Sequence, residues 1–202
     1  AAEHRCFACH ATGVPARRML ELAMDAPALD GIGSRRDAGW MAEWILNPTQ
    51  LRPQATMPAL LHGATAEAKA IAAFLGSLKS GDNSLGEKVD EQSAEVGQKL
   101  FTQLNCAACH TNAGQPPAEG KVALDQARWK FGQADSLATF LRNPQAHYRW
   151  NRMPNFALTP DEATALAAHL FQSADLGKRE NIAANATSIA MGRKLVQSTG
   201  CL

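Results

Sequence analysis

Two five-residue segments of the chain, 6–10 and 106–110, share one pattern of cysteine and histidine, Cys-x-x-Cys-His. This spacing is the attachment signature of a c-type haem. Two thiols one helical turn apart can form thioethers to the two vinyl groups of one haem, and the histidine that follows then lies under the iron as an axial ligand. The pattern therefore predicts two covalently bound haems, held by Cys6, Cys9 and His10 and by Cys106, Cys109 and His110.

Cys-x-x-Cys also occurs in zinc sites and in redox-active dithiols. A zinc site needs a second close pair of Cys or His for each copy, and none follows either segment at the usual spacing. A dithiol of the thioredoxin kind lies in a βαβ unit, which this sequence does not predict. The duplication favours haem, because both copies have matching surroundings.

These surroundings repeat along the chain with a period of 95 or 96 residues. Segment 44–48 reads Trp-Ile-Leu-Asn-Pro, and segment 140–144 reads Phe-Leu-Arg-Asn-Pro. At the same offset of 96, a Met-Pro pair at Met57 corresponds to a Met-Pro pair at Met153. The repetition predicts two domains of one type.

A third copy begins near the end of the sequence. Segment 192–196 matches segment 97–101 at an offset of 95, and Cys201 then stands where a haem motif would open. We interpret this as the start of a truncated third repeat. A helix over 188–200 should be loosely held unless it docks on the first repeat, which shows no helix before its own motif. Docking is favoured because the helix predicted at 66–78 has an apolar face, including Phe74, with no earlier partner.

Helical periodicity dominates the chain between the motifs. Apolar residues at i, i+3, i+4 and i+7 predict helices over 66–78, 94–105 and 160–172. Shorter helices are predicted over 38–46 and 135–142, each ending at an Asn-Pro pair, because the residue before proline is disfavoured in helical conformation. No segment predicts a strand.

Length and composition limit the remaining possibilities. The chain has 202 residues with 46% hydrophobic and 19% charged residues, and its net charge is +1. This balance is typical of a folded protein, and abundant alanine favours helices. No basic run supports nucleic-acid binding. No apolar stretch approaches the roughly 18 residues of a membrane helix, so we expect no membrane span in this chain.

The order of N-terminal helix, haem motif, loop, middle helix, methionine loop and C-terminal helix resembles the class I cytochrome c domain. The resemblance implies an all-α fold of two tandem domains of this type with long haem-wrapping loops. The expected parts are domain 1 over 1–79, a linker over 80–92, domain 2 over 93–174, and a linker with the start of a third repeat over 175–202.

Two contacts inside each domain are implied by the same resemblance. A glycine of the N-terminal helix, here Gly97, meets an aromatic residue of the C-terminal helix, which corresponds to Phe74 in repeat one and to His169 in repeat two. A proline carbonyl also contacts the histidine N–H. Pro27 matches that proline in repeat one, whereas segment 121–125 of repeat two has none.

Axial ligation separates an electron carrier from an enzyme. Met57 and Met153 are the candidates for the second ligand of each iron, because both lie in a repeated Met-Pro loop between the middle and C-terminal helices. His147 is an alternative ligand in repeat two. Arg35 is a candidate partner of a haem propionate, although it could equally be a solvated surface charge. Trp44 is interpreted as a core residue.

The predicted function is electron transfer by two haem c groups with His/Met ligation, as a carrier or as a relay segment of a larger redox protein. The alternative is a dihaem enzyme, a peroxidase or a sulfur-compound oxidase, with one open or replaceable axial position. The expected partners are transient redox proteins or adjacent domains of the same polypeptide. The resemblance implies a periplasmic or exported bacterial protein.

Overall fold

The computed structural model describes residue 10 and residues 26–80, 91–116, 118–146, 148, 150–174 and 180–197. The described chain forms two compact units. Unit 1 contains His10, residues 26–80, Tyr148, Trp150 and residues 180–197, and unit 2 contains residues 91–116, 118–146 and 151–174. The expectations for Cys6, Cys9, His147 and Cys201 lie outside the described residues.

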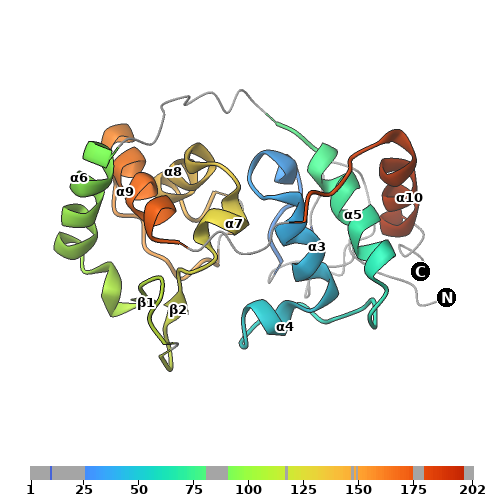
Figure 1. Cartoon of the computed structure of the whole chain (residues 1–202), viewed down its shortest axis with the longest axis horizontal. Helices are drawn as coiled ribbons and strands as arrows, with labels where there is room; N and C mark the ends of the chain where they lie inside the picture. The colour runs from blue at the N-terminus through green and yellow to red at the C-terminus, as the bar shows by residue number, and fades with distance from the viewer. Residues whose placement is uncertain are drawn as a thin grey trace. The chain divides into compact units, whose positions relative to one another are not determined.

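Both units are built from short helices joined by loops (Figure 1). The elements of unit 1 are η1 (Ile32–Ser34), α3 (Ala38–Leu46), α4 (Pro48–Leu51), α5 (Thr65–Ser77) and α10 (Ala186–Gln197). The elements of unit 2 are α6 (Glu91–Gln103), η2 (Cys106–Ala108), β1 (His110–Thr111), β2 (Val122–Ala123), α7 (Ala127–Phe131), α8 (Ala134–Arg142) and α9 (Pro160–Ser173).

The five helices predicted from periodicity are confirmed, with ends that differ by at most three residues. Both Asn-Pro pairs end a helix in the same way. Asn47 follows α3 with φ −150° and ψ 83°, and Asn143 follows α8 with φ −149° and ψ 81°. These angles lie outside the helical region, which a following proline disfavours for the residue before it.

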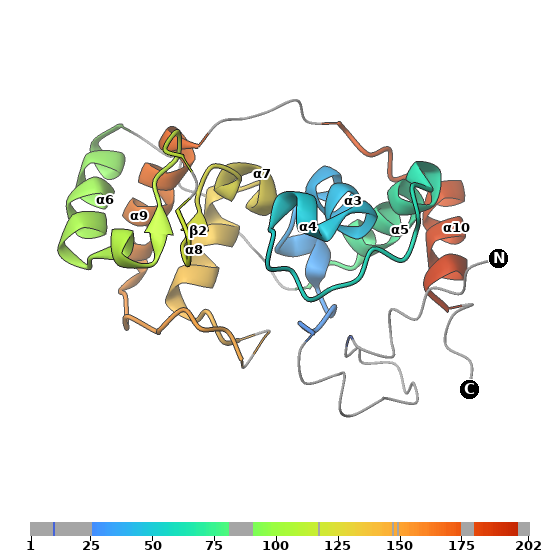
Figure 2. The same cartoon turned by 90° about the horizontal axis from the view of Figure 1, so that it is seen from below.

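The prediction of no strand was wrong for unit 2. β1 and β2 form a two-residue parallel pair in which His110 is opposite Val122 and Thr111 is opposite Ala123 (Figure 2). The amide of Val122 donates to the Cys109 carbonyl at 2.9 Å. A pair this short leaves no alternating pattern in the sequence, because each strand has only two residues.

In unit 2, α6 crosses α9 closely, and Gly97 makes the approach possible. A Cβ atom at Gly97 would overlap the Ala165 carbonyl oxygen and would lie 2.8 Å from the Cβ of His169. The expected meeting of Gly97 with the C-terminal helix is therefore confirmed. The core around this crossing consists of buried apolar side chains of four helices: Phe101, Phe131, Leu137, Leu141, Leu166, Leu170 and Phe171.

In unit 1, α10 crosses α5 in the same manner. A Cβ atom at Gly192 would overlap the Ala70 carbonyl oxygen and would lie 2.8 Å from the Cβ of Phe74. Val196 is 1% exposed, and the guanidinium of Arg193 lies 5.6 Å from the centre of the Phe74 ring. The predicted docking of this helix on the first repeat is confirmed.

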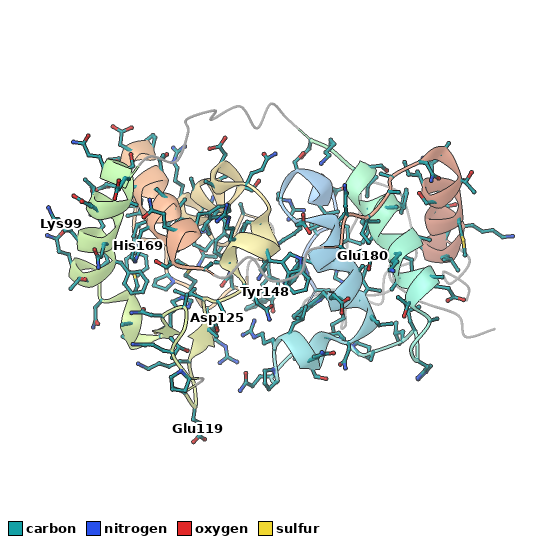
Figure 3. All side chains as sticks on the ribbon, in the orientation of Figure 1. Lys99, Glu119, Asp125, Tyr148, His169 and Glu180 are labelled. Carbon is teal, nitrogen blue, oxygen red and sulfur yellow. The ribbon has the colours of Figure 1, made fainter. Side chains whose placement is uncertain are left out.

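A second contact fastens the segment that leads into α10. The ammonium of Lys69 on α5 forms an ion pair with Glu180 at 2.6 Å (Figure 3 labels Glu180). The Glu180 carbonyl oxygen would lie 2.6 Å from a Cβ atom at Gly39 of α3. The segment 180–197 therefore contacts both long helices of residues 26–80.

Candidate haem-binding sites

The Cys-x-x-Cys-His segment of unit 2 runs from the end of α6 into β1. Asn105 adopts the left-handed conformation with φ 53°, and η2 then carries Cys106. Both cysteines of this segment are free thiols, with Cys106 half-buried and Cys109 exposed. Burial raises the pKa of Cys106, and the neighbouring Cys109 raises it further. Because neither thiol is fully buried, Cys106 and Cys109 are both accessible for covalent attachment of a cofactor.

His110 follows directly, and its ring is held by the strand pair. Its Nδ1 lies 3.1 Å from the carbonyl oxygen of Val122. Because a carbonyl only accepts, this contact places the ring hydrogen on Nδ1 and leaves the lone pair of Nε2 for a metal. Burial lowers the pKa of His110, and this favours the neutral imidazole that can bind iron.

His10 of unit 1 makes the same kind of contact with a backbone carbonyl. Its Nδ1 lies 2.7 Å from the carbonyl oxygen of Pro27, so the expected proline contact is present. Burial lowers the pKa of His10, and the hydrogen bond to Pro27 opposes that change. Val122 stands 95 residues after Pro27 and supplies its carbonyl without being a proline. The contact uses a backbone atom, which any residue can provide.

Arg35 braces the loop that carries Pro27. One nitrogen of its guanidinium, Nη2, donates to the carbonyl oxygens of Ala28 at 2.8 Å and of Asp30 at 2.7 Å. Burial lowers the pKa of Arg35 to about 10, and Asp30 opposes the change. The Nε of Arg35 is buried and has no hydrogen-bond partner among the described residues. Arg35 therefore fixes the conformation of this loop, and its Nε–H is available to an anion. A contact with a haem propionate stays a prediction.

The two candidate methionines lie in the loops before the C-terminal helices, and both are half-buried. The Sδ of Met57 accepts a hydrogen bond from the indole Nε1 of Trp44 at 3.1 Å. Trp44 is itself half-buried, so the interpretation as a plain core residue was incomplete. The sequence signal that could have revealed this contact is the position of Trp44 on the last turn of α3, just before the Met-Pro loop.

The Met153 loop of unit 2 is held by its backbone instead. The side chain of Asn151 accepts a hydrogen bond from the Met153 amide at 3.0 Å, and Gln145 donates to the Met153 carbonyl at 2.6 Å. Asn151 also donates to the Pro144 carbonyl at 3.0 Å. The Met153 side chain packs against the core of unit 2. Sequence reasoning identified the methionine and missed both amide side chains.

Unit 2 also contains buried donors that suit an anionic prosthetic group. The indole Nε1 of Trp129 and the hydroxyl of Thr111 are buried, and neither has a hydrogen-bond partner among the described residues. Buried polar groups are normally satisfied, so such orphans indicate a partner that the protein itself does not supply. Together with two free thiols and a histidine with a free Nε2, these groups fit a covalently bound haem.

Comparison with known proteins supports this assignment for unit 2. Residues 94–174 match the family model of Cytochrome c. No curated protein and no solved structure matches the chain. The match supports one cytochrome c domain over this segment, and domains of that class carry covalently bound haem c with iron and transfer electrons. Within the described residues, none of the helices is both long and apolar enough to cross a membrane.

Proposed function

We propose that the chain carries single electrons on two haem c groups, one in each unit, with His/Met ligation. Cys106, Cys109, His110 and Met153 hold the group of unit 2. The equivalent residues of unit 1 are Cys6, Cys9, His10 and Met57. The observation that carries the proposal is the matched contact of the two histidines, whose Nδ1 atoms both lie against a backbone carbonyl oxygen.

Unit 1 lies outside the family match, so the internal correspondence supports its role. Helix α10 covers α5 as α6 covers α9, with Gly192 in the place of Gly97. Pro27 stands in the place of Val122, and Met57 in the place of Met153. Three features of unit 1 thus correspond to features of unit 2, the unit that the family match covers.

The residues of the chain perform distinct tasks in this proposal. Haem c, when bound, supplies a reversible one-electron iron couple. The thiols attach the group, and the backbone carbonyls of Pro27 and Val122 orient the imidazole rings and increase their basicity. The thioethers of Met57 and Met153 would be the second protein ligands of the two irons, and ligation by both residues would leave no open position for a substrate. Such a closed site favours transfer between proteins over small-molecule catalysis.

The partners that follow are transient redox proteins or adjacent domains of one polypeptide, in a periplasmic or exported bacterial setting. A net charge of +1 provides little long-range steering toward a strongly charged partner. Interfaces of electron-transfer partners are commonly small, so recognition needs only a limited surface.

The first test counts haems. The protein is produced in a host that matures c-type cytochromes, and intact mass and haem content are measured for the wild type and for two double variants. Two haems are expected in the wild type, and one in each of Cys6→Ala/Cys9→Ala and Cys106→Ala/Cys109→Ala. A wild type with a single haem in unit 2 would overturn the proposal for unit 1.

The second test concerns ligation and redox chemistry. Both ferric haems are expected to be low-spin with a sulfur-to-iron band, part of which disappears in Met57→Ala and in Met153→Ala. Redox titration is expected to give two one-electron steps. A high-spin ferric haem in the wild type, with turnover of peroxide or thiosulfate, would instead support the dihaem enzyme. An unchanged band in Met153→Ala would point to His147 as the ligand.

A further inference from the structure

The two methionine loops are held by different hydrogen bonds. In unit 1 the contact reaches the sulfur itself, because the indole N–H of Trp44 donates to the Sδ of Met57 at 3.1 Å. Among the residues that the structure describes in unit 2, Gln145 and Asn151 form hydrogen bonds with the backbone of Met153 and not with its sulfur. The sulfur atoms of two otherwise equivalent loops therefore experience different surroundings.

This difference follows from the residues at equivalent positions of the two repeats. Position 44 corresponds to Phe140 at an offset of 96, and a phenyl ring has no N–H to donate. Gln145 and Asn151 correspond at the same offset to Thr49 and Ala55. Alanine cannot replace the amide of Asn151, and threonine lacks the reach and the NH₂ group of Gln145. Each unit therefore lacks the side chains that form the corresponding hydrogen bonds in the other unit.

The donor in unit 1 is fixed in place. Trp44 lies on the last turn of α3, and its ring stacks on Trp40 with 5.1 Å between centroids and 18° between planes. Trp40 is 7% exposed, and its own amide is anchored by the N-cap residue Asp37 at 3.0 Å. A stacked ring on a capped helix loses little further freedom when it donates, so the contact to the sulfur is preorganised.

We propose that Trp44 is a positioning residue that raises the reduction potential of the haem of unit 1 through its hydrogen bond to Met57. This inference rests on the proposed function. A thioether sulfur has two lone pairs, of which one can bind iron while the other accepts the N–H. The hydrogen bond withdraws electron density from the sulfur. Ferric iron depends on that donation more than ferrous iron does, so the reduced state gains.

The test exchanges the two side chains. Trp44→Phe removes the N–H and keeps an aromatic ring, and Phe140→Trp places an indole N–H at the equivalent position of unit 2. Phe140→Leu is the matched control, because it changes the same site without a donor. The potentials of both haems are measured by spectroelectrochemical titration, with thermal unfolding of each variant as a check on folding.

Trp44→Phe is expected to shift the ferric-to-ferrous ratio of unit 1 about threefold toward ferric at a fixed potential. At about 59 mV per tenfold change for a one-electron couple, this is about 30 mV downward. The haem of unit 2 is expected to keep its potential in this variant. Phe140→Trp is expected to raise the potential of unit 2, and Phe140→Leu is not.

The outcomes separate this inference from the function on which it rests. A wild-type spectrum without methionine ligation in unit 1 contradicts the proposed function before any variant is made. With ligation present, unchanged potentials in both Trp44→Phe and Phe140→Trp overturn the role of Trp44. If Trp44→Phe loses the Met57 ligand altogether, Phe140→Trp decides: a higher potential in unit 2 supports the inference, and an unchanged one overturns it.

Discussion

The crossings of α6 with α9 and of α10 with α5 share one geometry and differ in how the chain reaches it. In unit 2, α6 leads directly into the haem motif at Cys106. In unit 1, the equivalent helix comes after α9 in sequence, more than 100 residues from α5. The comparison shows that this helix position is defined by the surface that the C-terminal helix presents. A glycine that faces a backbone carbonyl allows the close helix crossing, whether its helix comes before or after the C-terminal helix in the sequence.

The residues beside the two glycines are not the same. The Phe74 ring of unit 1 is covered by Arg193, with the guanidinium 5.6 Å from its centre. The equivalent residue of unit 2 is His169 on α9, beside α6 (Figure 3), whose ring lies 5.5 Å from that of Phe101 in a tilted arrangement. Burial lowers the pKa of His169. An apolar ring in one unit is therefore replaced by a titratable ring in the other.

The largest expected effect comes from the glycines themselves. Gly97→Ala is expected to destabilise unit 2 by about 3 kcal/mol, because the new methyl group overlaps a backbone carbonyl that cannot move without separating α6 from α9. Gly192→Ala is expected to release α10 from α5 to a similar degree. Hydrogen exchange resolved by segment measures both effects separately, since two units need not unfold together.

Gly76→Ala in α5 is the matched control for these variants. A Cβ atom at Gly76 would meet only the Ala38 Cβ at 3.5 Å and the Met41 Cε at 4.0 Å, which are ordinary contacts. It should leave exchange in α5 unchanged or slow it, because alanine favours a helix by up to about 1 kcal/mol over glycine. Equal exchange in Gly97→Ala and in Gly76→Ala would refute the close-crossing argument.

The next effect concerns the start of the C-terminal helices. In α9, Thr159 and Glu162 form a capping box, with Thr159 accepting from the Glu162 amide at 3.3 Å and Glu162 accepting from the Thr159 amide at 2.8 Å. In α5 the N-cap residue is Ala64, which makes no side-chain cap. Thr159→Ala is expected to cost unit 2 about 1 kcal/mol, and Ala64→Thr is expected to stabilise unit 1 by a similar amount.

Denaturant titration at several pH values checks the capping box. The hydrogen bonds from Thr159 lower the pKa of Glu162, so its contribution is present above the ordinary carboxyl value of 4.5 and is lost as the pH falls through the lower folded value. The difference in free energy of unfolding between the wild type and Thr159→Ala should therefore become smaller at acidic pH. A gap that stays constant would show that Glu162 has no part in the cap.

The smallest expected effect is the pH dependence that His169 confers on unit 2. Because the folded pKa of His169 is lower than its ordinary value of 6.5, the unfolded chain binds the proton more readily. Unit 2 should lose stability as the pH falls below 6.5, and His169→Phe should remove that part of the dependence. Phe74→His should introduce it into unit 1. The partly exposed ring keeps the effect small, since solvent screens the charge.

Thermal unfolding followed between pH 5 and pH 8 measures these changes in the form of the protein that contains haem. His10 and His110 are the proposed iron ligands in this form and take up no proton there, and the comparison of each variant with the wild type isolates position 169 or 74. If His169→Phe retained the full pH dependence of unit 2, the effect would have to come from another group.

Much of this protein could be predicted from its residues alone. The two haem motifs, the helices and the Asn-Pro ends are local patterns that depend on the spacing of a few residues, and the repeat is visible because these patterns recur at an offset of 95 or 96. The docking of α10 on α5 also followed from the repeat, because Gly192 matches Gly97 at an offset of 95. Family comparison bears on unit 2, whereas the haem of unit 1 remains a proposal.

Only the tertiary structure decided which atoms meet between distant segments. In unit 2 the carbonyl of Val122 takes the role that the carbonyl of Pro27 has in unit 1. Residue type does not reveal this contact, because every residue has a backbone carbonyl. The contacts of Trp44 with the Met57 sulfur, and of Gln145 with the Met153 backbone, depend on how two loops fold back on the preceding helices. Side-chain hydrogen bonds of this kind require an alignment within a few tenths of an ångström, which the packing of whole helices sets and residue spacing does not.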